Sequence, residues 1–128
     1  MDEKRKILIV DDTPANLKTL AAILKQDYQI IIAKSGEEAL EILSSQALPH
    51  LVLLDVVMPG LDGYDVCTRL KSSRKTKEIP VIFLTGRTDA EDKKKGLDMG
   101  AAAFITKPFD ALTVTQIVKT HIWLNRGY

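Results

Sequence analysis

Five side chains that could bind a cation and a phosphate group each lie at the end of a short apolar run. Asp11 and Asp12 follow Ile-Leu-Ile-Val, and Asp55 closes Leu-Val-Leu-Leu. Thr85 follows Val-Ile-Phe-Leu, and Lys107 ends Ala-Phe-Ile-Thr-Lys. Two carboxylates about 4 Å apart repel by about 4 kcal/mol at an effective dielectric constant of roughly 20. Such a cluster needs cations to remain ionised, so the residues predict an acidic site that binds a metal ion and phosphate.

The donor set favours Mg²⁺, with Mn²⁺ as the alternative. Neither His nor Cys accompanies the carboxylates, and ligation by oxygen only selects these ions over Zn²⁺. Lys107 supplies one further positive charge. Each residue taken singly also has a structural interpretation, because an Asp or Thr after a strand often caps the next helix. Capping does not explain why all five side chains follow strands.

Apolar runs and helical patterns alternate five times along the chain. Unbroken apolar runs are typical of parallel strands that are covered on both faces. The predicted strands cover residues 6–11, 28–33, 50–55, 80–85 and 102–106. The predicted helix starts are Thr13 with Pro14, capping boxes at Ser35–Glu38 and Thr88–Glu91, Asp62 for a helix reaching Lys71, and Asp110.

Five β-α units predict an α/β fold, with a doubly wound, five-stranded parallel sheet of order 2-1-3-4-5 and five helices, the flavodoxin-like arrangement. Strand 28–33 then lies at one edge, and its end, Ala33-Lys-Ser-Gly, is the one that carries no such chemistry. The other four strands are adjacent, and the carboxyl ends of parallel strands meet at one edge of the sheet. With 128 residues and 45% hydrophobic content, we expect one domain over 1–128.

Composition argues against several classes of partner. The 18 lysines and arginines nearly balance the 17 aspartates and glutamates, so we expect no direct binding to nucleic acid or to an anionic membrane. The single Cys67 cannot form an internal disulfide. No apolar run approaches the ~20 residues of a membrane span, and the chain enters its first strand without a signal-peptide pattern. We expect a cytoplasmic protein.

At these residues the chain resembles the receiver domain of two-component response regulators. The motifs that carry the resemblance occur in the family's order and at its spacing, and they cover essentially the whole chain. They are Ile7-Leu-Ile-Val-Asp-Asp-Thr-Pro, Leu53-Leu-Asp-Val-Val-Met-Pro-Gly-Leu-Asp-Gly, Val81-Ile-Phe-Leu-Thr-Gly and Phe104-Ile-Thr-Lys-Pro-Phe.

The resemblance implies a phosphorylation-activated switch rather than an enzyme that turns over a substrate. Asp55 would accept a phosphoryl group from a sensor histidine kinase or a histidine phosphotransfer protein. Asp12, Asp55 and the backbone carbonyl of Val57 would ligate Mg²⁺, with Asp11 acting through water. Lys107 would pair with Asp55 and then with the phosphoryl group.

The remaining implied roles concern switching and lifetime. Thr85 and Phe104 would form the switch pair, and Pro108 would follow a cis peptide bond. Val57 and Arg87 would set the phosphoryl lifetime: Val57 cannot orient an attacking water, so we expect slow self-hydrolysis. Trp123 falls off the apolar stripe of the last helix, so it is an interface candidate. Output would pass through the fourth helix, fifth strand and fifth helix, to a second copy, a partner or an attached effector domain.

Two alternatives remain open at this stage. A haloacid-dehalogenase-like Mg²⁺-dependent phosphatase also uses an aspartyl nucleophile at a strand end, but it needs a second Asp two positions later. Thr13 and Val57 occupy those positions after Asp11 and Asp55. A non-phosphorylated scaffold receiver would have lost Asp55 or Lys107, and both are present. We expect either a stand-alone regulator or a receiver excised from a longer regulator, with a modest similarity of its last helix to receivers in cyclic-dinucleotide signalling proteins and hybrid kinases.

Overall fold

The sheet has the strand order that the sequence predicts. In the computed structural model, which describes residues 4–45, 47–86 and 90–124, five parallel strands pair in the order β2-β1-β3-β4-β5. The strands are β1 (Arg5–Val10), β2 (Tyr28–Ala33), β3 (Leu51–Asp55), β4 (Val81–Thr85) and β5 (Ala103–Thr106). The helices are α1 (Pro14–Leu24), α2 (Gly36–Leu43), α3 (Gly63–Lys71), α4 (Ala90–Asp98) and α5 (Ala111–Leu124).

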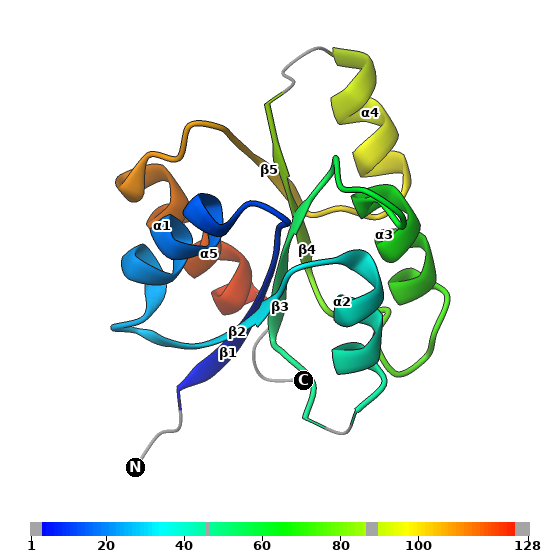
Figure 1. Cartoon of the computed structure of the whole chain (residues 1–128), viewed down its shortest axis with the longest axis horizontal. Helices are drawn as coiled ribbons and strands as arrows, with labels where there is room; N and C mark the ends of the chain where they lie inside the picture. Colours follow the sequence, from blue (N-terminus) through cyan, green and yellow to red (C-terminus); the bar gives the residue numbers. More distant parts are fainter. Residues whose placement is uncertain (1–3, 46, 87–89, 125–128) are drawn as a thin grey trace.

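Helices cover both faces of the sheet, with α1 and α5 on one side and α2, α3 and α4 on the other (Figure 1). The side chains of each strand alternate between the two faces, so the sheet divides the apolar interior into two cores. Leu17, Leu20 and Val114 belong to the core beneath α1 and α5, whereas Val66 and Phe83 belong to the core on the other face. All five residues of β3 and of β4 are buried, as the unbroken apolar runs predict.

The starts of α1, α2, α3 and α5 agree with the predicted positions, but two capping details differ. Thr13 is the N-cap of α1 and Pro14 follows it, yet the Thr13 side chain makes no capping hydrogen bond. Ser35 accepts a hydrogen bond from the backbone N–H of Glu38, whereas the Glu38 carboxylate accepts one from Lys34 rather than from Ser35. The predicted capping box of Ser35 and Glu38 therefore has one of its two hydrogen bonds. The predicted box at Thr88 and Glu91 lies outside the residues and side chains that the structure describes.

The spacing of Val114, Ile117, Val118, His121 and Leu124 predicts one stripe of α5 that packs on the sheet, and the structure differs from this prediction at the last turn. Val114 and Val118 are buried, and Ile122 packs against the same core. Leu124, which this spacing places on the packed side, is 52% exposed. Trp123 is 60% exposed, so its side chain lies off the packed stripe.

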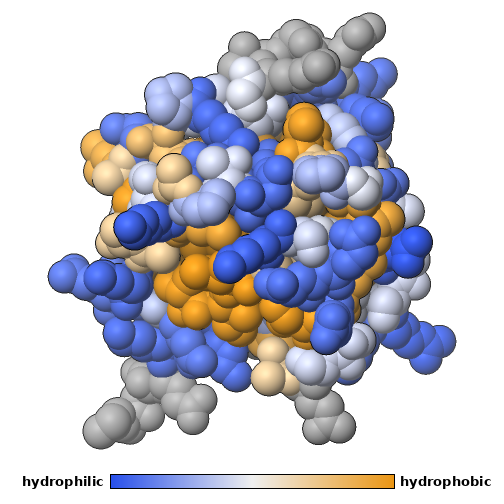
Figure 2. All heavy atoms as spheres, viewed as in Figure 1, coloured by the Kyte–Doolittle hydropathy of each residue, from blue (hydrophilic) through white to orange (hydrophobic). Residues whose placement is uncertain are grey.

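The edge strand β2 is the most accessible part of the sheet. Its Ile32 side chain is 39% exposed, and its other isoleucines are only partly buried. Figure 2 shows one face of the molecule, on which hydrophilic residues surround and partly cover hydrophobic residues that reach the surface near its centre. Within the described part of the chain, no helix has the length and apolar character to cross a membrane.

Candidate functional site

The pairing of the strands brings the predicted site residues to one edge of the sheet. Val10 pairs with Leu54, Asp55 with Leu84, and Thr85 with Thr106. The residues that end or follow β1, β3, β4 and β5 are therefore neighbours, as the strand order requires. This is the edge at which open α/β sheets bind ligands.

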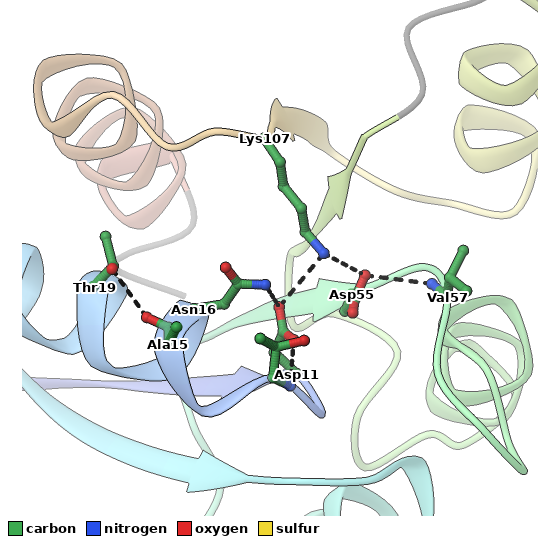
Figure 3. A network of polar contacts seen from close by, with 8 residues as sticks. Asp11, Ala15, Asn16, Thr19, Asp55, Val57 and Lys107 are labelled. Carbon is green, nitrogen blue, oxygen red and sulfur yellow. Dashed lines mark hydrogen bonds and ion pairs between the residues drawn. The ribbon is translucent and has the colours of Figure 1, made fainter.

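Lys107 reaches from the end of β5 to both buried carboxylates (Figure 3). Its Nζ donates a hydrogen bond to Oδ1 of Asp55 at 3.1 Å and lies 3.7 Å from Oδ2 of Asp11. Asp11 and Asp55 are 0% and 3% exposed, so water screens this ion-pair network poorly. The Lys107 backbone N–H also donates to the carbonyl of Thr85 at 2.9 Å, which ties the lysine to β4. The Lys107–Pro108 peptide bond is cis.

Asp11 is held by the chain that follows it. Its Oδ1 accepts a hydrogen bond from the backbone N–H of Thr13 at 2.9 Å, and its Oδ2 accepts one from Nδ2 of Asn16 at 3.2 Å. The Thr13 N–H that bonds to Asp11 lies at the cap of α1. Asn16 is a site residue that we did not predict from the sequence. Its signal was its place in the first turn of the helix that begins directly after the two aspartates.

The surroundings of Asp55 disfavour the ionised form of its carboxyl group. Burial is the main cause that raises the pKa of Asp55 to about 6. The hydrogen bond from Lys107 opposes that rise, and the negative charge of Asp11 adds to it. Asp55 also accepts a hydrogen bond at Oδ1 from the backbone N–H of Val57 at 3.3 Å, which favours the ionised form. At neutral pH the group is mostly ionised, but one lysine does not fully compensate the two buried carboxylates.

The carboxylates fit a divalent cation. Asp11, Asp12 and Asp55 each offer one oxygen, and these oxygens all lie within 4.8 Å of one another. Asp12 is exposed whereas the other two are buried, so the group opens toward solvent on one side. An open, oxygen-only site suits Mg²⁺, which keeps several water ligands and takes few carboxylates. The negative charge that Lys107 leaves uncompensated gives the physical reason for a cation here.

The turn after Asp55 depends on a close backbone approach. A Cβ atom at Gly63 would overlap the carbonyl oxygen of Asp55 and would lie 2.8 Å from Cα of Val56. The Gly63 N–H donates to the carbonyl of Val56 at 2.9 Å, so α3 begins against the end of β3. Val57 projects away from this packing and is 68% exposed. Its side chain therefore borders the mouth of the site, where it offers no polar group.

The two predicted switch residues lie on neighbouring strands behind the site. Thr85 ends β4 and is 6% exposed. Phe104 pairs with Phe83 in the sheet, is half-buried, and its ring centroid lies 5.8 Å from that of Phe83. Arg87 lies outside the described residues. Trp123 belongs to the last turn of α5, which runs back from the site edge, so it takes no part in the acidic site.

A family model gives an independent comparison. Residues 7–119 match the model described as the response regulator receiver domain. The matched segment contains every residue of the acidic site and all five strands except the first two residues of β1.

Individual relatives agree with this match. A protein from Vibrio cholerae named as a probable cyclic di-GMP phosphodiesterase is 44% identical over 121 residues, which are 94% of this chain and 27% of that protein. The response regulator PleD of Caulobacter vibrioides is 42% identical over 116 residues, 90% of this chain and 25% of its own. The chain thus spans about a quarter of the length of these relatives.

A solved structure shows the same fold. The signal receiver domain of a signal transduction histidine kinase from Syntrophus aciditrophicus has 37% sequence identity and a TM-score of 0.88. The comparison covers 97% of this chain and 94% of that domain.

Proposed function

Because the chain belongs to the response regulator receiver domain family, we propose that it is a two-component signalling switch that is phosphorylated on Asp55. The observation that supports this most directly is the placement of the Lys107 ammonium, 3.1 Å from Oδ1 of Asp55, beside three carboxylate oxygens within 4.8 Å of one another. The arrangement provides a nucleophile, a fixed positive charge and a cation site.

Asp55 needs no general base, since its carboxylate is mostly ionised at neutral pH with a pKa of about 6. Both Lys107 and the Val57 N–H hold Oδ1, so we assign Oδ2 as the attacking atom. The bond from Oδ2 to phosphorus forms as the phosphorus–nitrogen bond of a phosphohistidine donor breaks, and the leaving imidazole takes a proton from solvent. Lys107 then lies beside the new phosphoryl group and neutralises part of its charge.

Asp12, Asp55 and the Val57 carbonyl are the proposed Mg²⁺ ligands, with Asp11 acting through water. When bound, the cation would neutralise charge on the phosphoryl oxygens during transfer. Asn16 and the Thr13 N–H hold Asp11 in place for this task. The chain's own contribution is to keep the carboxylates at fixed positions.

Intact-mass measurement with acetyl phosphate tests the assignment. We expect one added phosphoryl group in the presence of Mg²⁺, none with excess chelator, and none in Asp55→Asn. Asp62→Asn is the matched control, because Asp62 caps α3 through Asp65 and lies outside the acidic group. Full labelling of Asp55→Asn would overturn the assignment of the acceptor.

We propose that the phosphoryl group is long-lived. Val57 borders the site with an apolar side chain, so it gives an attacking water no hydrogen-bond partner. Arg87 is proposed to shield the phosphoryl group. Combining Val57→Asn with Arg87→Glu should shorten the lifetime of the acyl phosphate, measured by the decay of the labelled mass. An unchanged or longer lifetime would contradict these two roles.

The proposed donor is a sensor histidine kinase or a histidine phosphotransfer protein, and the proposed output surface comprises α4, β5 and α5. Thr85 and Phe104 lie next to this surface, and Trp123 is exposed on it. The occupant would be a second copy, a partner or an effector that shares the chain, consistent with the greater length of the relatives. Sedimentation with and without beryllofluoride tests self-association, and Trp123→Ala should weaken it. A mass that never changes would leave a separate partner or attached effector as the output.

A further inference from the structure

Helix α4 is held to the domain by very little apolar contact. Its sequence, Ala-Glu-Asp-Lys-Lys-Lys-Gly-Leu-Asp, is the most polar of the five helices. Among its residues whose burial is described (92–98), only Gly96 is buried. Leu97, its one large apolar side chain, is 53% exposed. Among residues 92–98, the position at which this helix packs most closely on the domain is therefore a glycine.

Gly96 rests directly on two aromatic rings. A Cβ atom at this position would lie 2.5 Å from Cζ and 2.9 Å from Cε1 of Phe104, and 3.0 Å from Cδ2 of Phe83. These distances are well inside van der Waals contact, so a methyl group cannot be added while the helix and the Phe104 ring keep their positions. Because position 96 is a glycine, the backbone of α4 lies in direct contact with the Phe104 ring on β5.

A second contact holds the neighbouring turn of the helix. Nζ of Lys95 lies 4.2 Å above the centroid of the Tyr64 ring, and that ring meets Phe83 edge-on at 5.4 Å. Beside this contact, α4 borders a recess of about 300 Å³ rather than packed side chains. The recess is lined by Val56, Val57, Met58, Asp62, Tyr64, Asp92 and Lys95, so it separates α4 from the turn after Asp55. Figure 1 shows α4 at the outer corner of its layer, next to α3.

We propose that Gly96 is the positioning residue that couples the Phe104 ring to helix α4. The inference rests on the proposed switch function and names the residue through which the switch reaches α4. No side chain lies between the Phe104 ring and the backbone of α4 at Gly96, so the two are in direct contact. A displacement of the ring therefore changes the surface on which the helix packs. With an alanine at position 96, the Phe104 ring and the α4 backbone cannot both keep their present positions. Either the ring or the helix must move.

The test follows the Phe104 ring by NMR in protein whose phenylalanines carry ¹³C-labelled rings. The chain has three phenylalanines, Phe83, Phe104 and Phe109, so the spectrum is simple, and Phe104→Leu identifies the Phe104 signals. In Gly96→Ala without any phosphodonor, we expect these signals to move by an amount comparable to the change that Mg²⁺ and beryllofluoride cause in the parent. Gly86→Ala is the matched control, since a Cβ at Gly86 meets no atom within 4 Å. It should leave the Phe104 signals in place.

Hydrogen exchange of the α4 amides provides the second measurement. In the parent, beryllofluoride should change α4 exchange on the order of tenfold, because a helix in which Gly96 is the one buried residue among 92–98 opens easily. In Gly96→Ala that response should fall by at least half. In Phe104→Leu, adding Gly96→Ala should alter α4 exchange much less than it does in the parent, because the closer of the two ring contacts is gone and Cδ2 of Phe83, at 3.0 Å, is the ring atom that remains.

The two proposals fail in different ways. If the parent takes up no phosphoryl group on Asp55, the proposed function fails, while the Gly96→Ala spectrum without phosphodonor still tests the coupling. Phe104 signals that stay at their parent positions in Gly96→Ala would overturn the coupling. If Gly96→Ala does not fold, the double variant with Phe104→Leu should restore folding, and a double variant that is also unfolded would overturn it as well.

Discussion

Helices α1 and α4 both follow a strand that contributes to the acidic site, but they are held to the domain in opposite ways. Helix α1 buries Leu17, Leu20 and Leu24 in the core on its face of the sheet. Helix α4 buries only Gly96 among its residues with described burial. Burial of a leucine side chain contributes roughly 1.5–3 kcal/mol, so α1 has a much larger apolar anchor.

The difference assigns separate tasks to the two helices. The first turn of α1 supplies Asn16, which holds Asp11 at the site, so a rigid α1 keeps a carboxylate in place. Regions with few buried apolar contacts are those that open most readily. Helix α4 is therefore the element most easily repositioned by a change near Thr85 and Phe104. Helix α1 keeps Asp11 in position, whereas α4 can move when the site changes.

The largest expected effect is on the α1 side. Leu20 is 0% exposed, so Leu20→Ala removes buried atoms and leaves a cavity, at a cost of about 2–5 kcal/mol in the free energy of unfolding. Leu97→Ala in α4 truncates a side chain of the same type that is 53% exposed, and it should change stability by less than about 0.5 kcal/mol. Urea denaturation of both variants measures the contrast.

Equal destabilisation by the two substitutions would contradict the comparison, since it would mean that α4 is anchored as firmly as α1. The slope of the transition with urea should stay at the parent value in both variants. A changed slope would indicate that the denatured state, rather than native packing, is responsible.

Most of the fold could be predicted from the sequence because its signals are strong and local. Runs such as Ile7-Leu-Ile-Val and Val81-Ile-Phe-Leu are buried on both faces, as is typical of a parallel sheet that helices cover on both sides. The strand order followed from the five alternating β-α units, and the positions of Asp11, Asp55, Thr85 and Lys107 at the ends of four adjacent strands agreed with it. The strand bounds were each predicted within one residue.

The details that could not be predicted depend on three-dimensional neighbours. Asn16 acts through a hydrogen bond to Asp11 that forms only once α1 turns back over the strand end. The importance of Gly96 arises from Phe104 and Phe83, which lie on two other elements. Glu38 accepts a hydrogen bond from the backbone N–H of Lys34 rather than from that of Ser35, which depends on the path of the chain before α2. A single sequence contains no periodic signal for such contacts.

The second prediction concerns the negative charge of Asp55, which is buried in the acidic site. Burial raises the pKa of Asp55 to about 6, above its unfolded value of 3.8. The folded protein therefore binds this proton more tightly than the unfolded chain does. The resulting stabilisation is present below about pH 4 and is lost as the pH rises through about 6. At neutral pH, Asp55→Asn should be more stable than the parent by on the order of 2 kcal/mol.

Thermal or urea unfolding of both proteins from pH 4 to pH 7 measures this difference, because all other groups titrate alike to a first approximation. The advantage of Asp55→Asn should grow with pH, and Mg²⁺ should reduce it at neutral pH by stabilising the parent carboxylates. A pH-independent difference would show that the ionisation of Asp55 in the folded protein costs nothing.

The third prediction concerns Asn16, through which α1 holds Asp11. Asn16→Ala removes the hydrogen bond to Oδ2 of Asp11, and loss of such a support typically weakens metal affinity by about tenfold or more. Isothermal titration with Mg²⁺ measures the change. Lys18→Ala, on the exposed face of the same helix, should bind Mg²⁺ within about twofold of the parent, a change small against the tenfold effect. Equal affinities in parent and Asn16→Ala would remove α1 from the list of elements that position the site.

The smallest expected effect tests the contact between Lys95 of α4 and the Tyr64 ring. Lys95 lies over the Tyr64 ring, and an exposed cation–π contact contributes about 0.5–1 kcal/mol. Lys95→Gln keeps most of the side-chain length but removes the charge, so α4 amides should exchange roughly two- to fivefold faster while global stability changes little. Lys94→Gln is the matched control, because Lys94 is exposed on the adjacent position and makes the same change in net charge. Faster exchange in both variants would point to net charge, and unchanged exchange in Lys95→Gln would mean that the contact with Tyr64 does not stabilise the helix. Faster exchange only in Lys95→Gln would show that the contact between Lys95 and the Tyr64 ring helps to hold α4, a helix without the buried leucines that anchor α1.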